Sequence, residues 1–255
     1  MDIRPGYREW APPQALRPVL ACVWSSVEPV DGQAMVLPDA CSDLIWQRGK
    51  GAFVAGPDTG PAPAPLPAGT VLVALRFRPG AGGSALGLPL TELQDLRVDA
   101  ADLSPALAGR LRGSLPPDLA LRELMAFAGD AVASRPPDRL ALHAARLLGA
   151  ERAGAGPVAA ALGISDRQLR RRLDDAAGLG PRALIRVLRF RRFLSGLDAA
   201  IEAGSAPDLA GLAADAGYAD QAHLTRECGR LSGQSPLALA RARAAGRTPA
   251  LPLTA

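Results

Sequence analysis

The feature that most constrains this chain is a short sequence pattern that occurs twice in its C-terminal half. Each copy opens on a glycine, Gly163 in the first and Gly217 in the second. The following positions of the two copies correspond at an offset of 55 residues: Leu169, Arg171, Gly178 and Pro181 recur as Leu224, Arg226, Gly233 and Pro236. A short helical segment precedes each glycine turn and a polar helix follows it. This duplication is the pattern of two helix-turn-helix units, and it favours DNA binding.

The first copy predicts a helix from about residue 157, a tight turn at Gly163 and a second helix. Ser165 is a good N-cap, and Gln168 three residues later completes a capping box. Helical spacing points Val158, Ala161, Leu162, Leu169, Leu173 and Ala176 inward. The opposite face then carries Arg167, Arg170 and Arg171, and an arginine in the major groove can bond to guanine through two atoms.

The second copy follows the same logic, with Asp220 as the N-cap of its polar helix. Leu224, Cys228 and Leu231 are expected to face inward. The outward face carries Gln221, Ala222, Thr225 and Arg226. Amide and hydroxyl side chains can read base edges, and arginine can reach a base or a phosphate.

A helix from Arg182 to Ser195 is expected to join the two units and to end before Gly196. Fourteen residues span roughly 20 Å at 1.5 Å per residue. Its residues Arg186, Arg189 and Arg192 add positive charge that suits DNA phosphates. Two reading helices about 34 Å apart occupy successive major grooves on one face of the duplex. One chain can then cover a two-turn site, so both a monomer and a homodimer remain open.

Residues 140–245 resemble the C-terminal DNA-binding domain of AraC/XylS-type transcription regulators. The residues that carry this resemblance form one long composite signature: Ala160-Ala161-Leu162-Gly163-Ile164-Ser165, Leu169-Arg170-Arg171, Gly178, Pro181, Arg189-Phe190, Ala213, Ala216-Gly217-Tyr218, Asp220-Gln221-Ala222-His223-Leu224, Arg226, Gly233 and Ser235-Pro236. The resemblance implies that the positions of Arg167, Arg170, Arg171, Gln221, Ala222, Thr225 and Arg226 contact bases. Ala222 departs from the polar residue often found there, and Leu173 replaces a phenylalanine.

The first 80 residues read as short strands separated by turns. We expect strands at Leu16–Ser26, Ala34–Leu37, Asp43–Gln47, Ala52–Ala55 and Thr70–Phe77. Five prolines between Pro57 and Pro67 predict an exposed loop. Helical patterns begin near Ala85, with a capped start at Ser104-Pro105, an apolar face from Leu121 to Val132 and a helix from Pro136 to Leu148.

Two further segments, Leu37–Trp46 and Arg76–Gly80, resemble an uncharacterised N-terminal domain of some regulators of this family. The resemblance implies a sensor or dimerisation module at residues 1–135. The expected fold is therefore α+β, with a small, mostly β N-terminal domain that also has helices. An all-α domain with two helix-turn-helix units follows at residues 136–245, and residues 246–255 form a flexible tail.

Charge and cysteine usage agree with this division. Residues 157–255 hold 14 arginines and 9 acidic residues, whereas residues 1–156 hold 15 basic and 16 acidic ones. The three cysteines form no Cys-x-x-Cys pair, which fits a reducing cytoplasm, the expected location. We expect no signal peptide, membrane span, metal or cofactor. Double-stranded DNA, an unknown small-molecule effector and RNA polymerase are the candidate partners.

Several side chains allow a second interpretation. Cys41, between Asp39 and Asp43, is either a redox or metal sensor or a buried structural thiol. His223 and His143 are expected to be ordinary helix residues. No catalytic set is recognisable, so we expect no enzyme. The rival class is an enzyme or small-molecule-binding β-domain protein in which DNA binding is secondary, and paired acids in a pocket of residues 1–135 would favour it.

Overall fold

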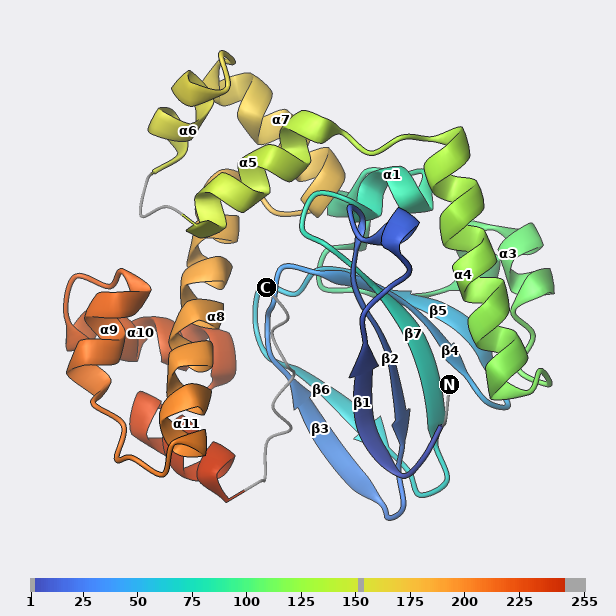
Figure 1. The fold of residues 1–255 in the computed structure, drawn as a ribbon, viewed down its shortest axis with the longest axis horizontal. Helices are drawn as coiled ribbons and strands as arrows, with labels where there is room; N and C mark the ends of the chain where they lie inside the picture. Colours follow the sequence, from blue (N-terminus) through green and yellow to red (C-terminus); the bar gives the residue numbers. More distant parts are fainter. Residues whose placement is uncertain (1–2, 151–153, 246–255) are drawn as a thin grey trace.

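A computed structural model describes residues 3–150 and 154–245 of the chain. Strands dominate as far as Asp99 and helices form the rest, so the predicted α+β class is confirmed (Figure 1). The expected tail at 246–255 and the centre of the expected glycine-rich joint, residues 151–153, lie outside the described residues. None of the described helices is both long enough and apolar enough to cross a membrane.

The N-terminal part is built on a six-stranded antiparallel sheet with the order β1-β2-β7-β4-β5-β8. Its strands are β1 (Gly6–Trp10), β2 (Leu20–Val27), β4 (Ser42–Gln47), β5 (Gly51–Ala55), β7 (Val71–Phe77) and β8 (Arg97–Asp99). All seven residues of β7 are buried, because both faces of the sheet are covered. Val73 and Leu75 belong to the larger core on one face, and Leu72 and Ala74 to a smaller cluster on the other.

Short helices and one long helix cover the larger core. They are α1 (Gly82–Leu86), α2 (Ala100–Leu103), α3 (Pro105–Arg110) and α4 (Pro117–Ser134), with the 3-10 turns η1 (Gln14–Leu16) and η2 (Leu90–Leu93). Ser104 caps α3 as expected, accepting a hydrogen bond from the backbone N–H of Leu107. Helix α4 lies against the sheet through Ala120, Leu124, Ala128 and Ala131, so small residues allow close packing.

The proline-rich segment is a loop only over residues 57–61, so the loop prediction was wrong for its second part. Residues Ala62–Leu66 form β6, which pairs with β3 (Gly32–Val36) in a separate two-stranded sheet. Each strand of such a ribbon keeps one open edge, so Pro63 and Pro65, at alternate positions, can turn their missing donors outward. Leu66 packs on the smaller cluster, so the ribbon covers the second face of the main sheet.

The remaining helices are α5 (Arg139–Ala150), α6 (Ala155–Ala161), α7 (Asp166–Ala177), α8 (Pro181–Glu202), α9 (Leu209–Ala216), α10 (Gln221–Ser232) and α11 (Pro236–Ala244). The prediction that this helix ends before Gly196 was wrong, because α8 continues for about two more turns to Glu202. A Cβ at Gly196 would lie 2.8 Å from Cδ2 of Leu212 in α9. The glycine therefore serves the close approach of α9 to α8 and does not end the helix.

The two parts of the chain share one packed interface. The expected division at residue 135/136 falls in the connection between α4 and α5. Leu37 and Ala40, which precede β4, belong to the same hydrophobic core as α7, α8 and α10. Arg191 of α8 donates a hydrogen bond to the carbonyl oxygen of Asp39 over 3.1 Å. Residues 37–40 thus join the N-terminal sheet to the helical part.

Candidate nucleic-acid interface

The first helix-turn-helix unit consists of α6, the Gly163 turn and α7. Gly163 has φ +65°, a conformation that glycine adopts without strain. The predicted capping box is present: the Ser165 hydroxyl accepts from the Gln168 N–H, and the Gln168 side chain accepts from the Ser165 N–H. Leu169, Leu173 and Ala176 are buried as expected. In α6, Val158 is buried as expected together with Ala159, whereas Ala161 is exposed. The first reading helix therefore starts at a fixed point.

The second unit repeats this construction with α9, Gly217 and α10. Gly217 has φ +86°, and the Asp220 carboxylate accepts from the His223 N–H over 2.6 Å. Tyr218 is buried beneath the turn and meets the His223 ring edge-on, with centroids 5.2 Å apart. Leu224, Cys228 and Leu231 are fully buried. His223 thus lies in the first turn of α10 and packs on Tyr218, and the cysteine is part of the core.

All seven predicted base-reading residues lie on the exposed surface of these two helices. They are Arg167, Arg170 and Arg171 on α7, and Gln221, Ala222, Thr225 and Arg226 on α10. Among the described residues, none of these arginines forms an ion pair with a carboxylate. Arg167 and Arg170 also line a cleft with Arg182 and Pro181, where α8 begins.

The three arginines assigned to phosphate contact occupy a different setting, because each is half-buried and bound within the protein. Arg186 pairs with Glu227 of α10 at 3.0 Å. The Arg189 guanidinium lies 5.5 Å from the centre of the Tyr218 ring. Arg192 donates to the carbonyl oxygens of Gly149 and Ala216, the latter over 3.0 Å. All three connect α8 to neighbouring elements, and their contact with DNA stays a prediction.

The N-terminal part of the chain contains a buried cluster of charged side chains that the sequence analysis did not predict. Arg76 of β7 forms a two-bond ion pair with Asp43 and lies 3.5 Å from Asp39 and 3.7 Å from Glu9. These acids surround an arginine instead of lining a pocket with free carboxylates. These acidic residues therefore serve as counter-ions of Arg76 and do not form the pair of free carboxylates that would favour an enzyme.

Cys41 is buried next to this cluster. Its backbone N–H donates to the Asp39 carboxylate over 2.8 Å. Burial raises the pKa of the Cys41 thiol above its ordinary value, which suits the structural interpretation. Among residues 3–150 and 154–245, no group of three or more histidine, cysteine or acidic side chains is arranged to hold a metal ion. His143 is exposed on α5.

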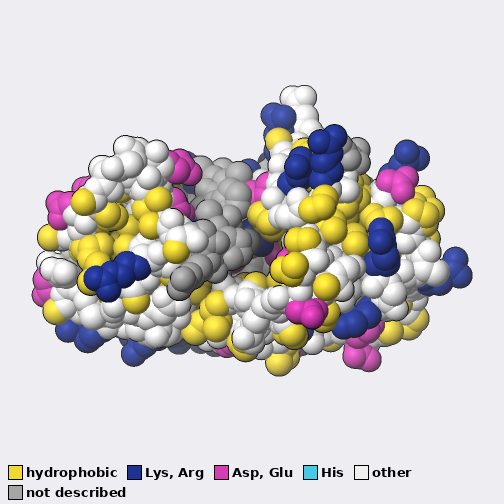
Figure 2. Space-filling view, turned by 90° about the horizontal axis from the view of Figure 1, so that it is seen from below, with side chains coloured by type: hydrophobic (Ala, Val, Ile, Leu, Met, Phe, Trp, Pro, Cys, Tyr) yellow, Lys and Arg dark blue, Asp and Glu magenta, His cyan; other side chains and the backbone are white. Residues whose placement is uncertain are grey.

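The face of the molecule shown in Figure 2 is not uniformly basic. The face viewed in Figure 2 carries basic, acidic and hydrophobic side chains next to one another. Large exposed hydrophobic side chains include Val30, Met35 and Leu237. The candidate DNA surface is therefore defined by the exposed arginines of α7 and α10.

Two family models match parts of this chain. Residues 158–242 match a family described as helix-turn-helix domain, and residues 8–99 match a domain of unknown function, DUF6597. The C-terminal part is thus a helix-turn-helix domain of the AraC type, as its composite signature predicted. The chain accordingly belongs to the class of DNA-binding transcription regulators, and double-stranded DNA is its partner.

Solved structures with some similarity are those of ToxT from Vibrio cholerae. The structure from strain O395 has a TM-score of 0.45 and 10% identity, covering 86% of this chain and 95% of that one. Unsaturated-fatty-acid-bound ToxT from strain SCE256 has a TM-score of 0.43 and 11% identity, covering 94% and 96%. These values are too low to transfer a ligand to this chain. No curated protein matches it.

Proposed function

We propose that this regulator reads a bipartite DNA site, with α7 and α10 in successive major grooves. The observation that carries the proposal is the pair of exposed reading faces, each on a helix with a capped start after a glycine turn. Both helices pack against α8, which has 22 residues and a length of about 33 Å. That length is close to the ~34 Å of one turn of duplex DNA.

The two reading faces differ in chemistry. Three arginines on α7 suit guanine O6 and N7, whereas α10 offers the amide of Gln221 and the hydroxyl of Thr225. The Thr225 hydroxyl donates to the Gln221 carbonyl oxygen over 2.8 Å, so its oxygen is left to accept from a base. Ala222 presents only a methyl group, which suits contact with the thymine methyl. We expect a guanine-rich half-site at α7 and a mixed half-site at α10.

The cleft beside α7 offers a phosphate contact. Arg167, Arg170 and Arg182 line it together with Pro181, the first residue of α8. The first N–H groups of a helix carry partial positive charge and attract phosphate. We assign Arg182 to the DNA backbone, in addition to the positions Arg186, Arg189 and Arg192, whose charges lie along the same helix.

We further propose that residues 1–135 act as a sensor or dimerisation domain and residues 136–245 as the DNA-binding domain, without catalysis. A small-molecule effector and RNA polymerase remain the proposed additional partners. An effector changes DNA binding only when it binds one conformation of the regulator more tightly than another. Because the two parts share a core through Leu37 and Ala40, a change in one part can reach the other.

Selection of bound sequences from random DNA, followed by footprinting, tests the bipartite site. We expect two conserved half-sites with centres about 10–10.5 base pairs apart, both protected on the same face. Arg171→Ala should relax sequence preference in one half-site and Arg226→Ala in the other. A single uninterrupted half-site that neither variant alters would overturn the proposal.

A further inference from the structure

The two helix-turn-helix units share one further feature, at the residue that follows the last predicted reading arginine of each. Arg172 follows Arg171 on α7, and Glu227 follows Arg226 on α10, so these positions also correspond at the offset of 55 residues. Both side chains are half-buried, whereas the arginines before them are exposed. Each forms an ion pair with an element outside its own unit. The repeated position therefore serves contacts within the protein.

The first ion pair joins α7 to the start of α5. Arg172 pairs with Asp138, the residue that immediately precedes α5. The two oxygens of this carboxylate have different partners. Oδ1 accepts from the backbone N–H groups of Leu140 and Ala141, over 2.9 and 3.1 Å, and Oδ2 accepts from Arg172. Because the cap holds the carboxylate in place, Arg172 meets a fixed partner.

The second ion pair joins α10 to α8. Nε of Arg186 lies 3.0 Å from Oε2 of Glu227, whose side chain is only 14% exposed, so salt screens this pair less than one on the open surface. Arg230 lies 3.9 Å from the other oxygen of Glu227, but it belongs to α10 itself and cannot orient that helix. Arginine has five N–H donors, so the ion pair does not preclude the phosphate contact proposed for Arg186.

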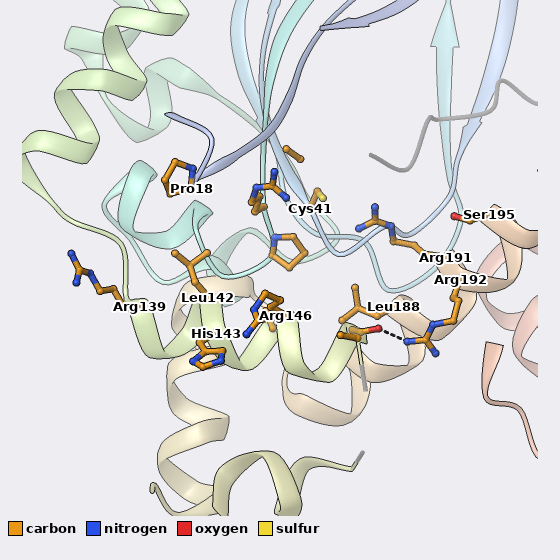
Figure 3. A pocket seen from close by; sticks show the side chains of 16 residues that line it. Pro18, Cys41, Arg139, Leu142, His143, Arg146, Leu188, Arg191, Arg192 and Ser195 are labelled. Carbon is orange, nitrogen blue, oxygen red and sulfur yellow. Dashed lines mark hydrogen bonds between the residues drawn. The ribbon is translucent and has the colours of Figure 1, made fainter. Parts of the chain in front are cut away.

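The two anchoring helices, α5 and α8, are themselves packed together. Ala144 and Leu148 of α5 belong to the same hydrophobic core as Val187 of α8. In Figure 3 the two helices lie next to each other, and the dashed line marks the hydrogen bond that Arg192 of α8 donates to the carbonyl oxygen of Gly149 in α5. Both ion pairs therefore attach a reading helix to one scaffold, formed by α5 and α8.

Hydrophobic packing alone leaves the rotation of a reading helix about its own axis weakly defined. Leu169 of α7 and Leu224 of α10 are fully buried, but burial of apolar surface is non-directional. Successive residues of an α-helix are about 100° apart around its axis, so a rotation by part of that angle redirects the side chains that face the bases. An ion pair next to a reading arginine opposes such a rotation.

We propose that Arg172 and Glu227 are positioning residues, which fix the rotation of α7 and α10 on the scaffold and thereby the sequence preference of each half-site. Neither residue contacts a base; each acts through the reading arginine that precedes it. The charge at this position is positive in the first unit and negative in the second, so the position recurs and the sign does not. Because α7 and α10 are taken as the reading helices, this role rests on the proposed function.

Removing the acid of each pair separates positioning from electrostatic attraction. Glu227→Gln and Asp138→Asn each remove a negative charge, which by itself strengthens binding to any DNA. Asparagine still caps α5, but when its oxygen accepts the cap its amide nitrogen meets the donor of Arg172. We expect the ratio of affinity for the selected site to affinity for random DNA to fall about fivefold in each variant, which corresponds to about 1 kcal/mol.

The loss should be confined to one half-site in each variant. Titration of labelled sites with single-base changes, at fixed salt, should show that Glu227→Gln tolerates changes in the half-site of α10 and Asp138→Asn those in the half-site of α7. Glu202→Gln is the matched control, because Glu202 is an exposed glutamate at the end of α8 and its loss changes the net charge equally. This control should keep the wild-type ratio.

Charge reversal gives an independent readout. Glu227→Arg alone should lose discrimination in the half-site of α10, and adding Arg186→Glu, which restores an ion pair of opposite polarity, should recover it. Thermal unfolding checks that each variant is folded. No recovery in the folded double variant would overturn the role of Glu227.

Equal gains in affinity for selected and random DNA in both acid variants would overturn the proposal, because the acids would then only oppose the charge of DNA. Losses spread evenly over both half-sites, with lower thermal stability, would also overturn it and assign the ion pairs to folding. A wild-type protein that prefers no DNA sequence would instead contradict the proposed function itself.

Discussion

Gly83 of α1 packs directly against the backbone of Asp175 in the last turn of α7. A Cβ at position 83 would lie 2.2 Å from the Asp175 carbonyl oxygen. Gly178, which follows the last residue of α7, is also close to the N-terminal part, because its Cβ would lie 2.8 Å from the carbonyl oxygen of Leu90. The C-terminal end of α7 therefore packs against the N-terminal part of the chain, whereas the N-terminal end of α7 is exposed.

This contact predicts that Gly83→Ala destabilises the protein. The obstructing atoms are backbone, which cannot rotate away, so we expect a loss of about 1–3 kcal/mol in the free energy of unfolding. Gly129→Ala in α4 is the control, because no heavy atom lies within 4 Å of its Cβ position and alanine favours a helix. Urea unfolding measures both. Equal stability of the two variants would show that α7 is not held at this contact.

The reading faces predict which arginines matter for affinity. Arg171→Ala and Arg226→Ala should each weaken binding to the selected site by about 1–3 kcal/mol if each makes a two-bond base contact. Arg122→Ala, far from both reading helices in the sequence and exposed on α4, should bind like the wild type. Titration of labelled DNA at fixed salt checks this. Wild-type affinity in both reading-helix variants would contradict the assigned faces.

Salt dependence separates free arginines from those held within the protein. The logarithm of affinity should fall with the logarithm of salt concentration by roughly 0.9 per phosphate contact. Because Arg186 already pairs with Glu227 and Arg182 is exposed, we expect Arg182→Gln to reduce this slope more than Arg186→Gln. A flat response of the wild type would rule out phosphate contacts, and the reverse order would assign Arg186 to the DNA.

Close approach of α8 and α9 gives another prediction. Gly196→Ala should destabilise the second unit, since the new methyl group meets Cδ2 of Leu212. Leu212→Ala removes that obstruction, so the double variant should lose less stability than the two single variants combined. Residues in contact show coupling energies of about 0.5–3 kcal/mol. Additive losses in a double-mutant cycle of urea unfolding would place these helices further apart.

The sequence predicted local structure better than tertiary contacts. The caps at Ser165 and Asp220 follow from residue types a few positions apart, and both are present. Strand β6 was missed because proline content says nothing about whether a strand has an open edge. The strands β1 and β8 were missed because neither has a marked apolar pattern; each is defined by its pairing partner. The cavity shown in Figure 3 combines residues 18–79 with residues 139–195, which no local pattern connects.

The buried cysteines predict how stability depends on pH. Burial raises the pKa of the Cys228 thiol from its ordinary value of 9.0 to about 12, and it raises those of Cys22 and Cys41 as well. Their stabilising effect is complete below pH 9, where the thiols of the unfolded chain are protonated too. It is lost as pH rises above 9, because the unfolded state then releases protons that the folded state retains.

Each such thiol should lower the free energy of unfolding by about 1.4 kcal/mol per pH unit above pH 9. Urea unfolding between pH 7 and pH 10 measures how the free energy of unfolding changes with pH. Cys228→Ala should reduce this slope by the contribution of one thiol, about 1.4 kcal/mol per pH unit. Tyr7 and Tyr218, whose pKa values burial also raises, add to the slope only near pH 10 and above. Thiol labelling at pH 8 should likewise be slow until urea is added. Rapid labelling of Cys41 in the folded protein would mean that this thiol is accessible, and the sensor interpretation would then replace the structural one.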